Sequence, residues 1–382
     1  MTTEYDVLVV GGRVAGASTA MLLARAGARV ALVERSAYGT DTVSTHGLMR
    51  AGVMQLARWG LLDDVAAAGT PPIRQTTFHY TDRASEQLAL RSSGGVDALY
   101  APRRYVLDRM LADAAADAGV EMWFRTPVTA VLRDESGRVT GVRVQDRELR
   151  AGITVGADGI RSTVASAVGA PVVRRGQSLS AILYRYYADA RPTGYEWAYG
   201  VGGGAGLIPT NDGLTCVFVA TTPDRMRALR RCGTERAFAT LLAETAPALA
   251  DRVSAAEPVG AMHGWAGAAG FVRECWGPGW ALVGDAGYYK DPITTHGITD
   301  ALRDAELLAR AILETHESYQ ATRDRLSSRL FAATETVASY RWSLDDVRVL
   351  LREVSSAMRD EVDHVGSLPD PGSAAHPADF LL

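Results

Sequence analysis

The chain begins with an apolar run, Tyr5 to Val10, followed by a glycine-containing turn and a segment of small residues from about Val14 to Ala26. A second apolar run, Ala28 to Glu34, ends in a carboxylate. Apolar runs of strand length on either side of a helical segment are typical of a βαβ unit whose parallel strands are buried on both faces. The pattern therefore predicts that an α/β domain starts at the N-terminus.

The next apolar positions predict helices and strands that continue this domain. One helical pattern covers about His46 to Val65, with a break at Gly60, and another covers Arg103 to Ala118. A further strand starting at Ile153 runs into an Asp-Gly turn. The strands expected before it are Val120–Phe124, Val128–Arg133 and Val139–Gln145.

Between about Pro171 and Gly270 the pattern changes to short strands rich in aromatic and β-branched residues. A buried strand returns at Trp280–Asp285, and from Gly297 the chain is mostly helical, with a loose tail from Leu368. The strands expected in the changed region are Ala181–Tyr187, Tyr195–Gly200, Gly206–Pro209 and Leu214–Ala220, with helices near Asp224–Arg231 and Thr234–Thr245.

These elements predict an α/β fold made of a Rossmann-like domain, an inserted and mostly antiparallel sheet, and a helical C-terminal region. The Rossmann-like domain is expected to comprise residues 1–72, 98–170 and 271–312. The inserted domain is expected at 73–97 and 171–270, and the C-terminal helices and tail at 313–382.

Composition narrows the functional classes. The formal net charge of the 382 residues is −4, and basic and acidic side chains are interspersed, so a nucleic-acid partner is not expected. The three cysteines fit neither a zinc site nor a disulfide framework, which favours a reducing compartment and no metal. The chain shows no signal peptide and no apolar run long enough to cross a bilayer, so we expect a cytoplasmic protein without a membrane partner.

The first chemical signal is Gly11-Gly12-Arg13-Val14-Ala15-Gly16, between a predicted strand and a predicted helix. Gly11 permits a tight turn, Gly16 permits close packing of the helix on the strand, and the helix N-terminus can bind a pyrophosphate. Glu34 is placed to accept hydrogen bonds from a ribose. Arg13 occupies the place of the usual middle glycine, so its side chain must point away from the phosphates or lie beside them.

Two further motifs follow predicted strands. Gly156-Ala157-Asp158-Gly159-Ile160-Arg161-Ser162 could be a ligand-binding turn or only a turn and a helix N-cap. In Val283-Gly284-Asp285-Ala286-Gly287, a carboxylate after a buried strand can hold a sugar or ribityl hydroxyl. A helix starting near Gly297 would direct its N-terminal N–H groups at a ligand above it, which would stabilise the negative charge of a reduced flavin.

Taken in this order, the motifs resemble those of the FAD-dependent monooxygenases with the para-hydroxybenzoate hydroxylase fold, over about Asp6 to Ala311. The resemblance implies that the first domain binds FAD and that the inserted sheet covers a substrate pocket. Residues that it places along FAD are Gly11, Gly12, Arg13, Val14, Ala15, Gly16, Glu34, Arg35, Arg50, Arg104, Val128, Asp158, Gly284, Asp285, Pro292, Gly297 and Ile298.

The sequence departs from the family pattern near the expected flavin ring. Where the family often has Gly-Gln-Gly-x-Asn after the proline, this chain has Thr295-His296-Gly297-Ile298-Thr299. His46 and His296 can exchange a proton near neutral pH, and with Pro292 they are the catalytic candidates, although a structural role is an alternative for each histidine. The substrate-binding candidates are aromatic side chains of the inserted sheet and of the third motif: Tyr184, Tyr186, Tyr199 and Tyr288.

The resemblance implies a monooxygenase that uses NAD(P)H and O₂, through a flavin C4a-hydroperoxide, to hydroxylate an aromatic or polyketide-like small molecule. The alternatives are an FAD-dependent reductase or dehydrogenase acting on a C=C bond and a redox-neutral, flavin-bound cyclase. The halogenase signature Trp-x-Trp-x-Ile-Pro is absent, since the chain has Trp197-Ala198-Tyr199. A separate flavin reductase is a possible partner, and both a monomer and a homodimer are compatible with the sequence.

Overall fold

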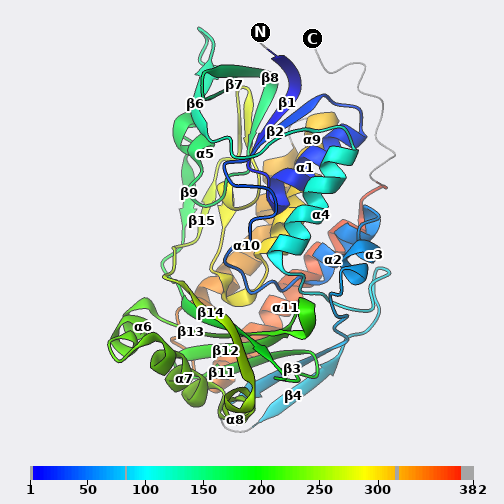
Figure 1. Ribbon diagram of the computed structural model, residues 1–382. Coiled ribbons are helices and arrows are strands. Elements are labelled where there is room, and N and C mark those ends of the chain that lie inside the picture. The colour runs from blue at the N-terminus through cyan, green and yellow to red at the C-terminus, as the bar shows by residue number, and fades with distance from the viewer. Residues whose placement is uncertain (1–2, 82–83, 315–317, 371–382) are drawn as a thin grey trace.

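A computed structural model describes residues 3–81, 84–314 and 318–370 (Figure 1). Its first sheet has the strand order β16-β17-β8-β1-β2-β5, and β7 joins β6 to the edge of β8. The central strands β1, β2, β5, β8 and β17 run parallel, with Val10 opposite both Val33 and Gly156. The bounds are β1 (Thr3–Val10), β2 (Val30–Val33), β5 (Glu121–Trp123), β6 (Val128–Arg133), β7 (Val139–Val144), β8 (Arg147–Gly156), β16 (Trp276–Gly277) and β17 (Trp280–Leu282).

Helix α1 (Val14–Arg25) packs on this sheet between α4 (Arg104–Asp117) and α9 (Gly297–Leu313). Small side chains make α1 narrow, and its residues from Val14 to Leu23 are all buried. The N-termini of α1 and α9 both lie at the carboxyl ends of parallel strands, which is where open α/β sheets bind ligands.

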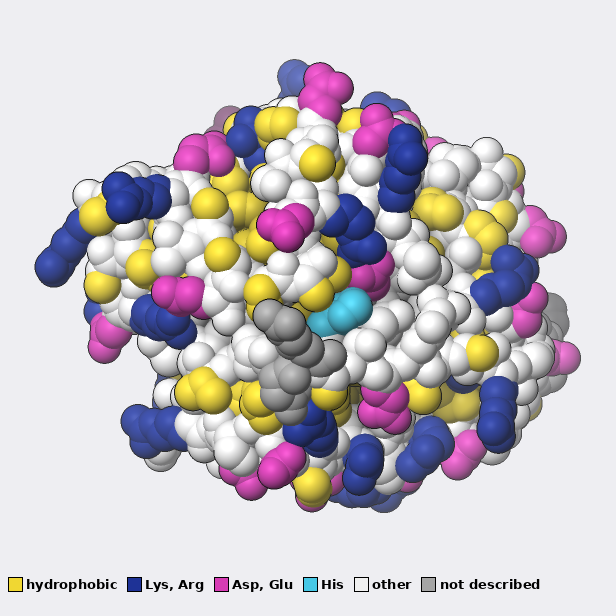
Figure 2. All heavy atoms as spheres, turned by 90° about the horizontal axis from the view of Figure 1, so that it is seen from below, with side chains coloured by type: hydrophobic (Ala, Val, Ile, Leu, Met, Phe, Trp, Pro, Cys, Tyr) yellow, Lys and Arg dark blue, Asp and Glu magenta, His cyan; other side chains and the backbone are white. Residues whose placement is uncertain are grey.

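The second sheet has the order β14-β10-β13-β12-β11-β3-β4, and its strands are antiparallel except for the pair β11 and β3. One face packs against α6 (Pro223–Arg230), α7 (Thr234–Thr245) and α8 (Pro247–Ala255), and the other faces the first domain. The strands are β3 (Gln75–Tyr80), β4 (Ser85–Ala89), β10 (Ala181–Ala188), β11 (Tyr195–Gly200), β12 (Gly203–Pro209), β13 (Thr215–Thr221) and β14 (Glu257–Trp265). Viewed from this end, basic and acidic side chains are interspersed over the surface (Figure 2).

A small sheet, β18-β15-β9, and two long helices complete the fold. The helices α10 (Ser318–Ala338) and α11 (Leu344–Ser367) pack on each other, and α11 also contacts α2 (Arg50–Arg58) and β11. The small sheet consists of β9 (Val172–Arg175), β15 (Phe271–Arg273) and β18 (Tyr288–Tyr289). Among the described residues, no helix combines the length and apolarity that crossing a bilayer requires.

The predicted α/β fold, with its antiparallel sheet and helical C-terminal region, is confirmed, but some boundaries differ. The helix expected from His46 begins at Arg50, because His46 adopts a left-handed conformation with φ of 66°. After the break at Gly60 a separate helix, α3, covers Leu62–Ala67. Helix α8 was not predicted, and the part of the predicted tail after Asp370 lies outside the described residues.

Candidate functional site

The glycines of the first motif form a cradle that side chains would fill. Gly11 has φ of +107°, and a Cβ there would lie 2.5 Å from the carbonyl oxygen of Ala157. A Cβ at Gly16 would overlap the carbonyl oxygen of Gly11. The glycines therefore bring α1 close to the carboxyl ends of β1 and β8, as a dinucleotide site requires.

Glu34 lies at the end of β2 and is held in place by the same motif. Its carboxylate accepts hydrogen bonds of 2.7 Å from the backbone N–H groups of Gly12 and Ser36. A cavity opens beside it, lined by Gly12, Arg13, Glu34, Ser36, Ala37, Tyr38, Gly39, Thr40, Asp108, Ala112 and Phe124. A fixed carboxylate at such a cavity can accept hydrogen bonds from a ribose, as predicted from the sequence.

The side chain of Arg13 points toward α4 and does not cover the backbone of the turn. Its guanidinium lies 4.0 Å from the carboxylate of Asp108, which also pairs with Arg104 at 3.0 Å. Burial and the neighbouring Arg104 lower the pKa of Arg13 from its usual value, without removing its charge near neutral pH. Arg13 and Arg104 thus form a shared positive region beside the cavity, which suits a phosphate-bearing ligand.

Four other predicted cofactor residues are bonded within the protein or lie at its surface, and no observation links them to a ligand. Arg50 donates hydrogen bonds to the carbonyls of residues 91, 93 and 96, and Asp158 caps α5 (Thr163–Val168) by accepting from Ser162 and two backbone N–H groups. Arg35 is exposed beside Glu34, and Val128 is half-buried at the start of β6. The contacts of these four residues with FAD remain predictions.

The third motif lies where α1 and α9 meet. Gly284 has φ of +59°, and a Cβ there would lie 2.8 Å from the Cβ of Ala15. Asp285 is accessible, although the residues on both sides of it are buried. The protein around this side chain still desolvates it, which raises its pKa to about 6 against the opposing effects of Lys290 and Arg104. Gly297, the first residue of α9, is also exposed.

The accessible position of Asp285 leads to a prediction. Replacing it with alanine is expected to weaken FAD binding about tenfold or more, because a carboxylate hydrogen bond to a hydroxyl is lost. The apoprotein is expected to unfold at the same or higher temperature near pH 7, since a carboxyl group with a raised folded-state pKa destabilises the fold above that pKa. Flavin titration and thermal unfolding of the Asp285→Ala variant test both effects, and unchanged affinity would contradict the assignment.

Pro292 lies in a short turn, η3 (Pro292–Thr294), that is anchored to the second sheet. The carboxylate of Asp291 accepts hydrogen bonds from the backbone N–H and hydroxyl of Ser180, at 2.6 and 2.8 Å, and from Ile293 N–H at 3.0 Å. Ser180 directly precedes β10. The turn at Pro292 is therefore fixed relative to the sheet expected to cover the substrate.

The structure brings two predicted substrate residues and one predicted catalytic residue together. The hydroxyl of Tyr186 lies 2.5 Å from Nε2 of His46, and Tyr184 accepts from the N–H of Ser44 at 3.3 Å. The guanidinium of Arg103 lies 3.8 Å from the ring centroid of Tyr186, and His263 stacks on Tyr184 at 4.9 Å. We call His46, Arg103, Tyr184, Tyr186 and His263 the tyrosine cluster.

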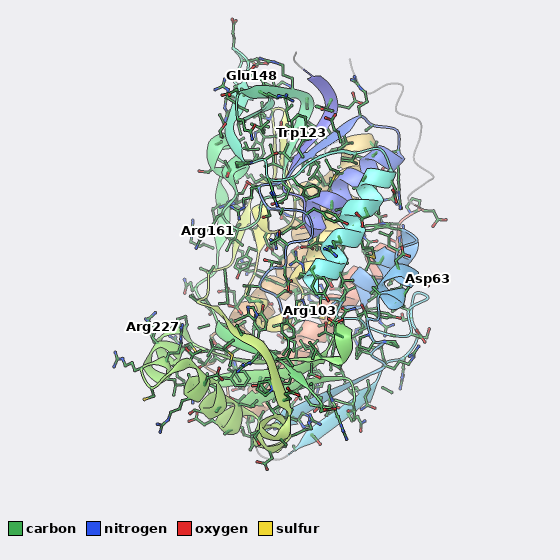
Figure 3. All side chains as sticks on the ribbon, viewed as in Figure 1. Asp63, Arg103, Trp123, Glu148, Arg161 and Arg227 are labelled. Atoms are coloured by element: carbon green, nitrogen blue, oxygen red, sulfur yellow. The ribbon has the colours of Figure 1, made fainter. Side chains whose placement is uncertain are left out.

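The tyrosine cluster lies between the two domains. Figure 3 shows Arg103 at the start of α4, above the second sheet. Arg103 also pairs with Asp41 at 3.1 Å, which ties α4 to the loop that carries His46. Within the described residues, Nδ1 of His46 and Nε of Arg103 are buried without a hydrogen-bond partner, so both atoms have unused hydrogen-bonding capacity.

Tyr199 and Tyr288 do not join this cluster. The ring of Tyr199 lies near Tyr80 and Trp342, beneath the C-terminal helices. Tyr288 is 1% exposed and packs near Phe331 of α10. Their predicted contacts with the substrate thus gain no support from their positions.

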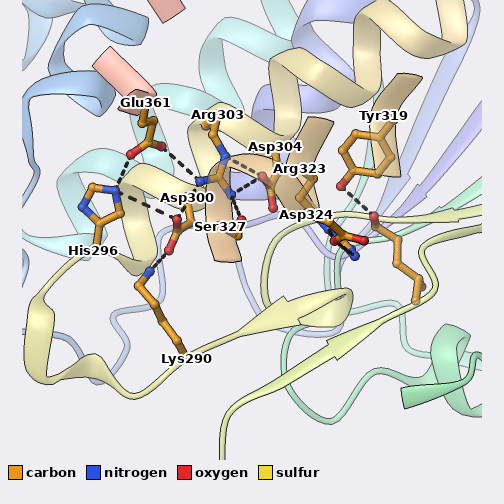
Figure 4. Close-up of polar contacts among 11 residues, drawn as sticks. Lys290, His296, Asp300, Arg303, Asp304, Tyr319, Arg323, Asp324, Ser327 and Glu361 are labelled. Atoms are coloured by element: carbon orange, nitrogen blue, oxygen red, sulfur yellow. Dashed lines mark hydrogen bonds and ion pairs between the residues drawn. The ribbon is translucent and has the colours of Figure 1, made fainter. Parts of the chain in front are cut away.

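His296 lies at a different place from His46. It directly precedes α9, and its Nε2 lies 2.5 Å from a carboxylate oxygen of Glu361 in α11 (Figure 4). His296, Asp300 and Glu361 are close enough to surround a metal ion. However, Lys290 contacts Asp300, and Arg303 contacts both carboxylates, so cationic side chains already pair with these carboxylates.

Sequence reasoning missed Arg103 and Glu361. Arg103 was treated only as the start of a helix, although it immediately precedes Arg104. Glu361 occupies a position on the buried stripe of α11, with Val354, Ala357 and Val365. A carboxylate on an otherwise apolar helix stripe is a signal of a buried partner, and it could have been found from the spacing.

Comparison with known proteins agrees with the nucleotide-binding geometry. A family model described as FAD binding domain matches residues 4–330. Digeranylgeranylglycerophospholipid reductase 2 of Methanopyrus kandleri is 28% identical over 78% of this chain and 74% of that protein. Menaquinone reductase of Mycolicibacterium smegmatis is 27% identical over 81% of this chain and 76% of that protein.

Solved structures share the fold. The flavin-dependent brominase Bmp2 has a TM-score of 0.76 and 21% identity, covering 99% of this chain and 97% of that one. PqsL of P. aeruginosa, in complex with 2-aminobenzoylacetate, has a TM-score of 0.74 and 23% identity over 94% of this chain and all of that one. At these identities, the similarity is evidence for the fold alone.

Proposed function

This chain belongs to the FAD-binding-domain family and is an FAD-dependent oxidoreductase, and from that premise we propose that it hydroxylates an electron-rich aromatic or polyketide-like small molecule. The observation that carries the proposal is the tyrosine cluster, which places two phenols, two imidazoles and a guanidinium between the domains. Polar and aromatic groups in one buried patch suit a flat substrate with an ionisable hydroxyl.

The residues described above fit FAD. The Gly11–Gly16 turn and the α1 N-terminus would hold the pyrophosphate, Glu34 the ribose, and Asp285 the ribityl chain. When bound, FAD supplies the redox chemistry, with NAD(P)H as the co-substrate that is typical of such enzymes. The chain itself binds and orients the reactants, excludes water and exchanges protons.

The proton exchange in this proposal takes place at the hydroxyl of Tyr186. Burial and the nearby charges of Arg103 and Arg104 lower the pKa of His46 well below its ordinary value, so the imidazole is neutral at pH 7. Burial raises the pKa of Tyr186, so the phenol keeps its proton. A substrate hydroxyl that donates to the Tyr186 oxygen would complete a hydrogen-bonded path, through that phenol, to Nε2 of His46, and the lowered pKa of His46 means that a proton would stay on the imidazole only transiently.

Other members of the cluster position the substrate. Arg103 is fixed from two sides, by Asp41 and by the ring of Tyr186, so its positive charge is held beside the tyrosine cluster. A fixed cation near the substrate favours its ionised, more electron-rich form. The stacked pair of Tyr184 and His263 offers an aromatic surface beside it.

Reduction of a C=C bond is the second candidate. Its support is sequence similarity, because the curated relatives named above are reductases. Tyr186 and His46 could also deliver the proton that such a reduction needs. The tyrosine cluster supports hydroxylation more directly, since the C=C bond of an aliphatic chain offers its arginine and histidines no polar group, and only a phosphate or quinone head group would do so.

The products separate the two candidates. Purified holoprotein is incubated with NADH or NADPH, under air and without oxygen, with a panel of phenols and aromatic keto acids and with isoprenoid quinones. Oxygen-dependent gain of one oxygen atom by an aromatic substrate supports hydroxylation, whereas oxygen-independent gain of two hydrogen atoms supports C=C reduction. If neither nucleotide reduces the flavin, the same panel is repeated with a separate flavin reductase.

A matched pair of variants tests the role of Tyr186. Tyr186→Phe is expected to lower kcat/KM on the order of 10²-fold, because the proton path to His46 is interrupted. Tyr187→Phe is the control, since Tyr187 lies on the opposite face of β10 and stacks on Phe238 of α7. Equal effects of the two substitutions would contradict the proposed path.

A further inference from the structure

A network of buried charges lies behind the N-terminus of α9 (Figure 4). His296 contacts Glu361 at 2.5 Å and lies 4.0 Å from Asp300. Arg303 is 3.0 Å from Asp300 and 3.3 Å from Glu361, and Lys290 also contacts Asp300. All five side chains are 6% exposed or less. The proposed function assigns no role to this network.

With Lys290 protonated, the network is one positive charge short of neutrality when His296 is neutral, and burial lowers the pKa of Lys290 to about 7. Its carboxylates are Asp300, Glu361 and Asp304, which pairs with Arg303 at 2.6 Å, and its cations are Lys290 and Arg303. The other polar groups near it are Ser327 of α10, which accepts from Arg303, and His364 of α11, within electrostatic reach of Glu361, with Asp285 beyond Lys290. The buried ring of Tyr288 also lies 5.3 Å from the ammonium of Lys290 and 5.9 Å from the guanidinium of Arg303. A proton on His296 would balance the charge of the buried group.

His296 has an atom available for that proton. A neutral imidazole that donates from Nε2 to Glu361 carries a lone pair on Nδ1. In the part of the chain that the structure describes, Nδ1 is buried and has no hydrogen-bond partner. His296 directly precedes Gly297, the exposed first residue of α9. Its side chain nevertheless makes no capping hydrogen bond to this helix.

This position couples His296 to charge at the open end of α9. The first N–H groups of a helix have no partner within the helix, and its dipole places partial positive charge there, so a negative ligand is favoured. Negative charge that appears in front of Gly297 favours a positive charge directly behind it. Coupling between two such sites is reciprocal, so a proton on His296 also favours the negative form of the ligand.

We propose that His296, held by Glu361, takes up one proton when the bound FAD is reduced. The inference rests on FAD binding and is independent of the proposed substrate. Two electrons and one proton from the reductant convert FAD to its anionic reduced form, and a second proton from solvent forms the N–H bond at Nδ1 of His296. Both protons leave when the flavin is reoxidised.

The pKa directions agree with this assignment. Burial lowers the pKa of His296 and outweighs Glu361, which raises it, so the imidazole is neutral at pH 7 before reduction. The carboxylate of Glu361 nevertheless lies close enough to stabilise a proton on it. Burial opposes ionisation of Glu361, but His296 and Arg303 outweigh it and hold its pKa at about 2. Glu361 therefore stays a carboxylate that can stabilise the imidazolium.

The test is the midpoint potential of the bound flavin, measured spectroelectrochemically on the holoprotein between pH 6 and 8. The slope of the potential against pH is expected to be about twice as steep in the wild type as in His296→Gln, because two protons instead of one accompany two electrons. Glu361→Gln is expected to reduce the slope as His296→Gln does. His364→Gln, on the same helix, is the control and is expected to keep the wild-type slope.

A second measurement uses only the wild type, so it tests the proposal even if the variants fail to fold. Proton uptake by the wild type on electrochemical reduction in weakly buffered solution is expected to be two per flavin, and the absorbance of the reduced flavin identifies a proton on the flavin itself. An uptake of one proton, or a second proton on the flavin, would overturn the proposal. So would a wild-type slope in the folded His296→Gln variant.

Discussion

Gly16→Ala is expected to lose most of its FAD. An added Cβ at this position would overlap the carbonyl oxygen of Gly11 and would also lie 3.0 Å from the Cβ of Ala157. Neither the Gly11 carbonyl nor the Ala157 Cβ can move without separating α1 from the carboxyl ends of β1 and β8. Overpacking of this kind costs about 1–3 kcal/mol, which corresponds to roughly a tenfold to hundredfold loss of affinity if it falls on the holo state.

Gly366→Ala provides the matched control. Gly366 also lies in a helix, α11, but a Cβ there would meet its nearest neighbour, the terminal methyl of Met54, at an ordinary 3.5 Å. Alanine is favoured over glycine in a helix by about 1 kcal/mol, so this variant is expected to be as stable as the wild type or more so. Flavin content per chain and FAD titration decide the outcome, and normal flavin content in Gly16→Ala would refute the proposed cradle.

Arg303→Met is expected to destabilise the fold by about 3–5 kcal/mol, because it leaves buried carboxylates without their partner. Arg303 is 1% exposed in its side chain, and it contacts Asp300, Asp304 and Glu361. Urea unfolding of the holoprotein measures the change. Arg329→Met is the control, since Arg329 pairs with Asp360 at the surface with 56% of its side chain exposed, and such pairs contribute about 1 kcal/mol or less.

The destabilisation by Arg303→Met is also expected to depend on pH. In the wild type the folded-state pKa of Glu361 is about 2, below the ordinary 4.5, so its contribution is present above pH 4.5 and is lost as the pH falls toward 2. Without Arg303 the buried carboxyl groups bind protons more tightly, so the variant gains stability relative to the wild type in that range. A difference between the two proteins that stays constant from pH 7 to pH 3 would contradict this account.

The tyrosine cluster and the charge network are two separate groups of polar side chains, and the proposals give them different roles in a flavoenzyme. The cluster faces the gap between the domains and can exchange protons with a substrate through Tyr186 and His46. The network lies behind α9, and in our proposal its His296 takes up a proton as the flavin changes charge. The two histidines, both catalytic candidates from the sequence, therefore lie at different places and have different roles in the two proposals.

Local sequence determined the nucleotide-binding half of the protein. The roles of Gly11, Gly16 and Glu34 could be predicted because they depend on backbone geometry and on strand–helix spacing. Both are set by residues near one another in the chain. The α/β fold and the inserted sheet were likewise predictable from the spacing of apolar positions. The sequence shows that Arg13 replaces the usual middle glycine. The direction of its side chain, however, depends on Asp108 in a different helix.

Only the tertiary structure decided which polar residues meet. Alternation along β10 separates Tyr184 and Tyr186 from Tyr187, yet the pattern alone does not say which face meets the flavin domain. His46 reaches Tyr186 across 140 residues, and His296 reaches Glu361 across 65. Such contacts arise from the packing of whole elements, because a side chain's long-range partner is set by the fold and not by its neighbours in the chain.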